Sequence, residues 1–351
     1  MDFVSFPGLG LEFELRRYAF SVFGIEIFWY GVIITLGFLA AVLMALRSCR
    51  KYDLTADNVL DLVLYAAPVA IVFSRLYYVV FNWDQFRNNL VSIIKIRDGG
   101  LAIYGAVIGA LLVAWIYTRK KKISFLNLCD FAVPYLVFGQ GVGRWGNFIN
   151  QEAFGTATQL PWRMNGNVID GYLRRNGYNP EIFGVHPTFL YESLLDIAIF
   201  LFLLFRRKRK KVEGEVLFLY FILYGAARAV IEGIRTDSLW LGSFRVSQML
   251  SVILVIVGIV LLLYRRAAMR KTEEEAVVLG QSRYGALLMK MKEEEAAEAA
   301  KAEADDTEKA GAEEAKESTE EEQTERTVSE EKSDEGSTAA GTIPEDDSSE
   351  A

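Results

Sequence analysis

Four polar residues recur at helical spacing within an apolar stretch in the second half of the chain. Tyr224, Arg228, Glu232 and Arg235 stand at positions i, i+4, i+8 and i+11, which places them along one face of a helix. Ionisable groups in an apolar stretch are costly unless they are paired or hydrated, so they indicate a functional site. Two guanidinium groups and a phenol on one stripe favour the binding of an anion. A purely structural pair between Arg228 and Glu232 is the alternative.

A second set of polar residues lies in a glycine-rich run at residues 139–155. Arg144, Asn147 and Asn150 recur there at three-residue steps, which puts a guanidinium group and two amides on nearby helix faces. Guanidinium geometry matches phosphate oxygens bidentately, so a phosphate-bearing head group suits this set. The run also contains the Gly-x-Gly-x-x-Gly spacing of dinucleotide sites. We reject a nucleotide site because the run ends an apolar helix instead of following a strand.

The stretches that must hold these residues are apolar and about as long as a membrane span. Lys and Arg concentrate in cytoplasmic loops, and four basic clusters divide the chain: Arg47/Arg50/Lys51, Arg119 to Lys122, Arg206 to Lys211, and Arg265/Arg266/Arg270/Lys271. Between successive clusters lies enough apolar sequence for two crossings of ~20 residues each. We therefore predict spans at about 27–46, 58–81, 99–117, 124–143, 187–205, 215–235 and 246–264.

The predicted fold is an all-α polytopic membrane protein with seven transmembrane helices. If all four basic clusters face the cytoplasm, the N-terminus lies outside and the C-terminus is cytoplasmic. We expect a membrane domain at residues 1–271 and a small external cap at about 147–185, because irregular backbone finds no partners in lipid. The expected location is a bacterial cell membrane, with the site toward the outer leaflet.

The depth of the polar side chains predicts a single outward-facing cavity. Counted from the basic clusters at about 1.5 Å per residue, several of them fall in the outer half of the membrane, namely Arg144, Arg228, Tyr30, Tyr104, His186 and Glu192. His186 is the only histidine, and the Pro187 that follows it suits a helix start. A structural role at that helix entry is therefore the alternative to proton transfer. Glu192 is available to pair with an arginine.

The charge distribution divides the chain into two parts of different composition, and the long uncharged stretches of the first part exclude a soluble globular enzyme. Residues 272–351 hold 26 acidic and 8 basic residues, a net charge of −18, whereas residues 1–271 carry a net charge of +11. The acidic part is poor in aromatic residues, so we expect it to be a disordered tail. Cys49 and Cys129 form no spaced array, so the sequence supports neither a disulfide framework nor a metal site.

Several segments together resemble the bacterial prolipoprotein diacylglyceryl transferase family over about residues 20–265. They are Phe28-Trp-Tyr-Gly31, Gly99-Gly-Leu-Ala-Ile-Tyr-Gly105, Gly143-Arg-Trp-Gly-Asn-Phe-Ile-Asn-Gln-Glu-Ala-Phe-Gly155, His186-Pro-Thr-Phe-Leu-Tyr-Glu192 and Tyr224-Gly-Ala-Ala-Arg-Ala-Val-Ile-Glu232. The resemblance implies that phosphatidylglycerol donates its diacylglyceryl group to the lipobox cysteine thiol in the signal peptide of an exported prolipoprotein. A thioether forms and glycerol phosphate leaves, as the first step of lipoprotein maturation. This chemistry needs no cofactor and involves no nucleic acid.

The resemblance also assigns roles to residues. It implies that Arg144 binds the lipid head group and that Arg228 is a second essential arginine. The further residues expected around the cavity are Asn147, Asn150, Glu152, Gly155, Tyr30, Tyr224, Glu232 and His186. Tyr104 stands where many relatives carry a histidine proposed as the base. A tyrosine with a pKa of about 10 is a poor neutral base for a thiol with a pKa of about 8.5. Nearby arginines are the alternative means of lowering the thiol pKa.

Two other function classes stay open on the residues alone. A transporter or lipid-binding membrane protein would use the same arginine-lined cavity without cleaving a bond. Its weakness is that the polar groups gather toward one face, whereas alternating access needs them toward both. A membrane anchor whose acidic tail recruits cytoplasmic partners would explain residues 272–351 but not the polar stripe.

Overall fold

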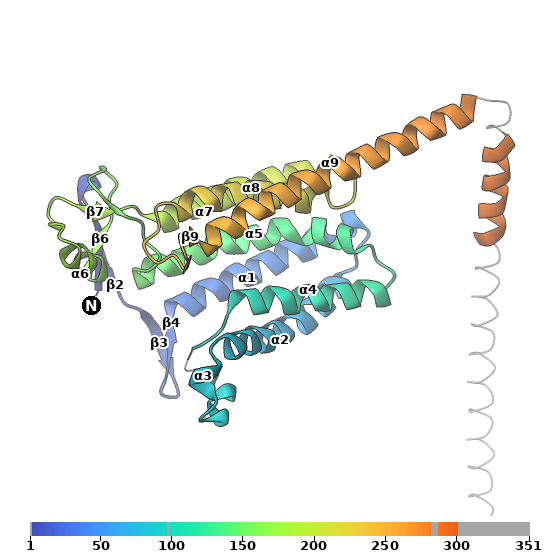
Figure 1. Cartoon of the computed structure of the whole chain (residues 1–351). Helices are drawn as coiled ribbons and strands as arrows, with labels where there is room; N and C mark the ends of the chain where they lie inside the picture. The colour runs from blue at the N-terminus through green and yellow to red at the C-terminus, as the bar shows by residue number, and fades with distance from the viewer. Residues whose placement is uncertain (1, 97–98, 282–286, 301–351) are drawn as a thin grey trace, which may run out of the picture. The chain divides into compact units, whose positions relative to one another are not determined.

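The computed structural model describes residues 2–96, 99–281 and 287–300 of the 351-residue chain. Among the described residues, the chain divides into two units between Met269 and Arg270. Among the described residues, each of the seven predicted spans corresponds to one long helix (Figure 1). These helices are α1 (Trp29–Ser48), α2 (Ala56–Phe81), α4 (Ile103–Lys120), α5 (Phe125–Asn150), α7 (Thr188–Arg207), α8 (Glu215–Glu232) and α9 (Val246–Gln281).

Of the seven long helices in the described part of the chain, five, all except α4 and α8, lie in stretches that are long and apolar enough to cross a membrane. Helix α8 has 18 residues and carries three charged side chains, Glu215, Arg228 and Glu232, which lower its apolar character. Helix α4 also has 18 residues, and Arg119 and Lys120 occupy its last turn. The chain is therefore a multi-pass membrane protein, and its seven crossings and their orientation stay predictions.

Side-chain caps fix where two of the helices begin. The Thr55 hydroxyl accepts a hydrogen bond from the Asn58 amide N–H, and the Asn58 side chain accepts one from the Thr55 N–H, so two backbone donors at the start of α2 are satisfied. Ser124 caps α5 in the same way through the Asn127 N–H. Both caps follow basic clusters, so the polar segment ends and the next apolar helix starts within a few residues.

Helix α5 lies at the centre of the bundle. It packs against α1 on one side and α7 on the other, and it also contacts α8, while α2 packs mainly against α4 (Figure 1). Its buried side chains, such as Leu128, Phe131 and Val137, form one core with residues of α1, α7 and α8. Because α5 is enclosed by these helices, polar residues on it face other helices instead of lipid.

A small cap with β-structure covers the end of the bundle at which α5 ends and α7 begins. Strand β1 (Asp2–Phe6) pairs antiparallel with β2 (Leu11–Leu15) and with β6 (Asn165–Gly166), and β5 (Ala157–Thr158) pairs with β7 (Gly184–Val185). Helix α6 (Asn167–Arg175) completes the cap. Its core is apolar and contains Val4, Phe6, Met164, Ile169, Leu173 and Val185, packed on Phe148 of α5 and Phe189 of α7.

The all-α prediction is right for the long helices and wrong for this end of the molecule. Helix α5 continues to Asn150, so the first residues expected in the cap are helical, and residues 2–15 belong to the cap, outside the range predicted for it. The two-residue strands β5, β6 and β7 are too short to show an alternation of apolar and polar residues, whereas β2, with the sequence Leu-Glu-Phe-Glu-Leu, does alternate and was missed. The remaining short elements are β3 (Tyr18–Val22), β4 (Ile25–Phe28), β8 (Trp240–Leu241), β9 (Phe244–Arg245), α3 (Trp83–Phe86), and the 3₁₀ helices η1 (Pro7–Leu9), η2 (Cys49–Tyr52) and η3 (Leu90–Ile94).

The described residues of the expected tail are helical. Helix α9 runs to Gln281, and residues 287–300 are also helical, so the prediction of disorder is wrong for these segments. Residues 289–300 consist almost entirely of Met, Lys, Glu and Ala, which all have high helix propensity, and this explains the helix. The rest of the predicted tail, residues 282–286 and 301–351, lies outside the described residues.

Candidate functional site

Three arginines converge on the carboxylate of Glu192, which is 5% exposed. Arg144 of α5 approaches one carboxylate oxygen at 2.5 Å, and Arg228 of α8 and Arg235, which follows α8, approach the other at 2.9 and 3.2 Å. Glu192 lies in the second turn of α7, so the cluster joins three helices. The spacing of α8 predicted that Arg228 and Arg235 share a face, and the packing of α5 and α7 adds Arg144 to them.

A second carboxylate, Glu232, extends this arginine cluster. Arg228 donates to Glu232 at 2.5 Å, and Arg235 lies 4.0 Å from it. Arg245, at the end of β9, donates to the backbone carbonyl of Glu232, and Arg235 also pairs with Asp237 at 2.8 Å. The Arg228–Glu232 pair, which was the purely structural alternative, is formed. It is part of a larger network, in which Arg228 serves two carboxylates at once.

The two asparagines of the glycine-rich run bind a third carboxylate. The side-chain amide groups of Asn147 and Asn150 both donate to one oxygen of Glu152, at 2.8 and 3.4 Å. This is possible because Gln151 adopts a left-handed conformation, with φ of 51°, that ends α5 and turns the chain back. The buried Gln151 side chain fixes the turn, since it donates to the Phe3 carbonyl and accepts from the Val168 N–H.

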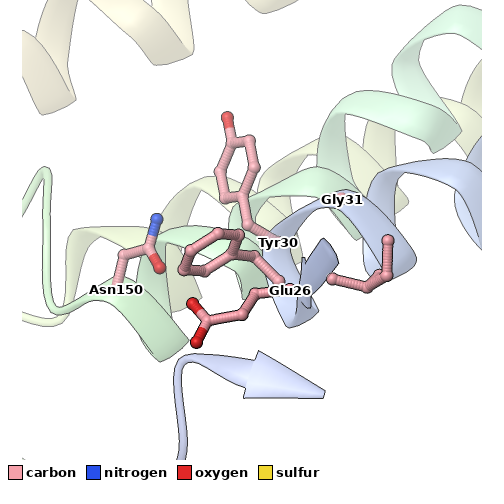
Figure 2. A pocket seen from close by; sticks show the side chains of 6 residues that line it. Glu26, Tyr30, Gly31 and Asn150 are labelled. Carbon is pink, nitrogen blue, oxygen red and sulfur yellow. The ribbon is translucent and has the colours of Figure 1, made fainter. Parts of the chain in front are cut away.

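A cavity of about 450 Å³ lies beside this turn, lined by Glu26, Ile27, Phe28, Tyr30, Gly31 and Asn150. Figure 2 shows the amide of Asn150 on the same side of the cavity as the carboxylate of Glu26, with the Tyr30 hydroxyl directed elsewhere. The Tyr30 ring packs directly on Gly146 of α5, where an added Cβ would lie 2.4 Å from a ring carbon. Gly146 therefore permits the close approach that brings Tyr30 to the end of α5.

Gly155 joins the loop after α5 to the loop after α8. Its N–H donates to the His186 carbonyl at 3.0 Å, and the adjacent Thr156 N–H donates to the Ile234 carbonyl at 2.8 Å, one residue before Arg235. An added Cβ at Gly155 would lie 2.7 Å from the His186 Cβ, so a side chain does not fit there. Gly155 thus sets the position of Arg235 through the backbone.

Three of the predicted site residues, His186, Tyr104 and Tyr224, take no part in the ion pairs of the arginine cluster among the described residues, although Tyr224 interacts electrostatically with Arg144 and Arg228. His186 lies 3.4 Å through Nδ1 from the Tyr191 hydroxyl, and burial lowers its pKa, so the imidazole is neutral at pH 7. Tyr104 packs on Tyr77 with ring centroids 6.1 Å apart, and Tyr224 stacks on Tyr220 at 5.2 Å. Among the contacts of the described residues, none connects Tyr104 or His186 to the arginines.

Three residues near the site were missed by the sequence reasoning. Arg245 stands just before the last apolar stretch, where a single arginine gives no distinctive signal, and Gln151 acts through its turn. Asp196 could have been predicted from the sequence, because it is a carboxylate inside a predicted span, four residues after Glu192. Within the described ranges, no group of three or more His, Cys, Asp and Glu residues is arranged to hold a metal ion.

Comparison with known proteins gives one consistent result. The family model described as "Prolipoprotein diacylglyceryl transferase" matches residues 17–264. A protein of Finegoldia magna is 46% identical over 246 residues, which cover 70% of this chain and 94% of that protein. A Clostridioides difficile protein is 45% identical, covering 70% and 93%, and a Listeria monocytogenes protein is 44% identical, covering 72% and 90%. All three are named phosphatidylglycerol–prolipoprotein diacylglyceryl transferase.

Proposed function

Since this chain belongs to the prolipoprotein diacylglyceryl transferase family, we propose that the arginine cluster around Glu192 is the place where it acts on its lipid substrate. The chain is a transferase that moves the diacylglyceryl group of phosphatidylglycerol to a prolipoprotein, in lipoprotein maturation. The observation that carries the assignment of the site is the convergence of Arg144, Arg228 and Arg235 on one buried carboxylate.

The lipid phosphate binds where the Glu192 carboxylate now holds the arginines. A carboxylate and a phosphate diester both present anionic oxygens to a guanidinium fork, and both bind it bidentately. Arg144 and Arg228 approach different oxygens of Glu192, so the carboxylate keeps the two cations near each other before the lipid arrives. Glu192 and Glu232 thereby offset the repulsion between arginines, and the phosphate replaces part of this compensation when it binds.

The arginines then stabilise the charge that develops as the bond breaks. The cysteine thiolate attacks the glycerol carbon of the diacylglyceryl group, a C–S thioether bond forms, and the C–O bond to phosphate breaks. The bonding electrons remain on the phosphate oxygen, and glycerol phosphate leaves. A preorganised charge at such an oxygen typically contributes ~3–4 kcal/mol. Among the described residues, Arg144 has one carboxylate partner, Glu192. Arg144 is therefore the arginine that most readily exchanges its carboxylate partner for the phosphate of the lipid.

The surrounding polar groups hold the rest of the head group and the acceptor. Asn150 and Tyr30 line the cavity beside the end of α5, with Glu26 as a further hydrogen-bond acceptor, so this cavity suits the hydroxyl groups of the glycerol head group. The acceptor is the lipobox cysteine in the signal peptide of a prolipoprotein. No cofactor takes part in this displacement, because the leaving group is already a phosphate ester.

The membrane placement follows from charge and from the position of the site. The basic residues in the last turns of α1, α4 and α7 lie at the helix ends opposite the cap and face the cytoplasm, and the cap and the arginine cluster face the outer side. The protein then resides in the bacterial plasma membrane, with the site toward the outer leaflet. The acidic C-terminal segment then lies in the cytoplasm and follows the part of the chain that matches the family.

Mass spectrometry of a lipobox peptide incubated with the purified protein in phosphatidylglycerol vesicles tests this function. We expect a diacylglyceryl thioether with the wild type and none with Arg144→Ala or Arg228→Ala. The matched control is Arg87→Ala, because Arg87 is an exposed arginine paired only with Asp84 in the described structure. A variant at Arg144 or Arg228 that inserts normally and keeps near-normal turnover contradicts the assigned role. Lipid binding without covalent product in the wild type would favour a transporter or lipid-binding protein.

A further inference from the structure

Asp196 is a buried carboxylate that the mechanism above does not use. It lies on α7 with 2% of its surface exposed, and its Oδ2 atom has no hydrogen-bond partner among the residues that the structure describes. An unpaired carboxylate in an apolar interior is costly, and in a membrane helix it indicates a functional group. The burial of Asp196 therefore calls for a reason other than packing.

The surroundings of Asp196 connect it to the arginine cluster. It follows Glu192 by one helical turn, about 6 Å along α7 toward the basic end. Arg144 on α5 and Arg228 on α8 act on Asp196 electrostatically, and so does Glu192 on its own helix. Tyr220 and Tyr224 on α8 also interact with it electrostatically. Both arginines form their ion pairs with other carboxylates. Asp196 therefore interacts with the arginines through their electric field and forms no ion pair with them.

The same face of α7 turns apolar directly beyond Asp196. Ile199, three residues further along, borders a groove of about 420 Å³ between α7 and α8, which is lined by Leu195, Ile199, Leu223, Ala226, Ala227 and Val230. Asp196 is thus the innermost carboxylate of the polar face. A groove with such a lining admits acyl chains and excludes water, so solvent does not supply a base at this depth.

The other carboxylates near the arginines are already occupied. Glu192 binds three arginines, Glu232 binds Arg228 and Arg235, and Glu152 accepts from two asparagine amides. A carboxylate that is fully engaged in this way is a weak proton acceptor. Asp196 is the one with a buried oxygen that lacks a partner in the described structure.

We propose that the Asp196 carboxylate accepts the proton of the cysteine thiol during diacylglyceryl transfer. This inference rests on the proposed function. The thiol S–H bond breaks and its proton passes to a carboxylate oxygen of Asp196, while the sulfur forms the C–S bond and the phosphate leaves with the C–O electron pair. Asp196 then returns the proton to the departing glycerol phosphate or to water. Atoms and charge balance, and no further reactant is required.

The test compares initial rates of the wild type and Asp196→Asn between pH 6 and 9.5, with the full chain in phosphatidylglycerol nanodiscs and a lipobox peptide. A general base contributes roughly 100-fold or more, so we expect at least this loss at pH 7. The loss should shrink to roughly threefold above the thiol pKa of about 8.5, where the thiolate forms without a base. The matched control, Asp61→Asn, changes a helix carboxylate that pairs with Tyr117 and Lys121 and should leave the profile unchanged.

A selenocysteine lipobox peptide provides one readout in the wild type, which does not depend on folding of the variant, and a second readout in the variant. A selenol is ionised at neutral pH, so the acidic limb of the wild-type pH profile should disappear with this peptide, and Asp196→Asn should approach wild-type rates. A loss that is constant with pH, or an acidic limb that persists with selenocysteine, overturns the role of Asp196. Absence of any thioether from the wild type overturns the proposed function itself, and the inference with it.

Discussion

Replacing Glu192 with Gln tests whether this carboxylate holds the arginine cluster together. The substitution keeps the size of the side chain and removes the charge that three guanidinium groups share at 2.5, 2.9 and 3.2 Å. Arg228 retains Glu232 and Arg235 retains Asp237, but Arg144 loses its sole ion-pair partner among the described residues. The effect should therefore fall mainly on Arg144.

The expected magnitude follows from the burial of the pair. Glu192 is 5% exposed and the Arg144 side chain 20%, so solvent compensates little for the lost charge. Removing one partner of a buried pair typically costs about 3–5 kcal/mol. In a neutral phosphatidylcholine membrane, we expect the free energy of unfolding of Glu192→Gln to fall by about 3 kcal/mol. In phosphatidylglycerol the loss should be smaller, because the lipid phosphate supplies the missing negative charge.

The assay combines stability in the two lipids with the rate of peptide modification. If the same free energy, about 3 kcal/mol, is also lost from stabilisation of the transition state because Arg144 is no longer held in place, kcat/KM should be roughly 100-fold lower. Asp84→Asn makes the same carboxylate-to-amide change at an exposed position and serves as the control. A folded Glu192→Gln protein with a rate within about threefold of the wild type would refute the reasoning. Equal destabilisation in both lipids would refute the exchange of carboxylate for phosphate.

Three further outcomes are expected. Gly155→Val should displace Arg235, because the new side chain meets the His186 Cβ, and activity should fall by roughly tenfold or more. Protease protection should show near-normal membrane insertion of this variant. Burial lowers the pKa of His186, so the unfolded state takes up a proton more readily; the free energy of unfolding should decrease as the pH falls through about 6.5, and a His186→Gln variant should lose this component in pH-dependent thermal unfolding. A chain truncated after Gln281 should retain wild-type transfer rates in the peptide assay, because the family match ends at residue 264.

Hydropathy and basic clusters located the long helices because a membrane span needs a fixed apolar length. Helix α2 begins two residues before its predicted start and ends at the predicted Phe81. The alignment of Arg228 with Glu232 was also predictable, since residues four apart on a helix are neighbours. The contact of Arg144 with Glu192 joins residues far apart in sequence and depends on how α5 and α7 pack, which local patterns do not encode. Depth alone also does not determine which face of a helix a residue occupies; the contact of Tyr104 with Tyr77 depends on how α2 and α4 pack.

The pairing of strand β1 with the cap has a consequence for the order of biosynthesis. Phe3 donates to the side chain of Asn167, which is 164 residues later in the chain, and β1 also pairs with β6. At ~5–20 residues per second, the ribosome completes that partner roughly 8–33 s after it makes β1. One edge of β1 therefore remains unpaired until several membrane helices have been inserted and β6 has been synthesised. Closure of the cap is expected to be a late, slow step of folding, and a chaperone on the side of the membrane where β1 emerges would act during this interval.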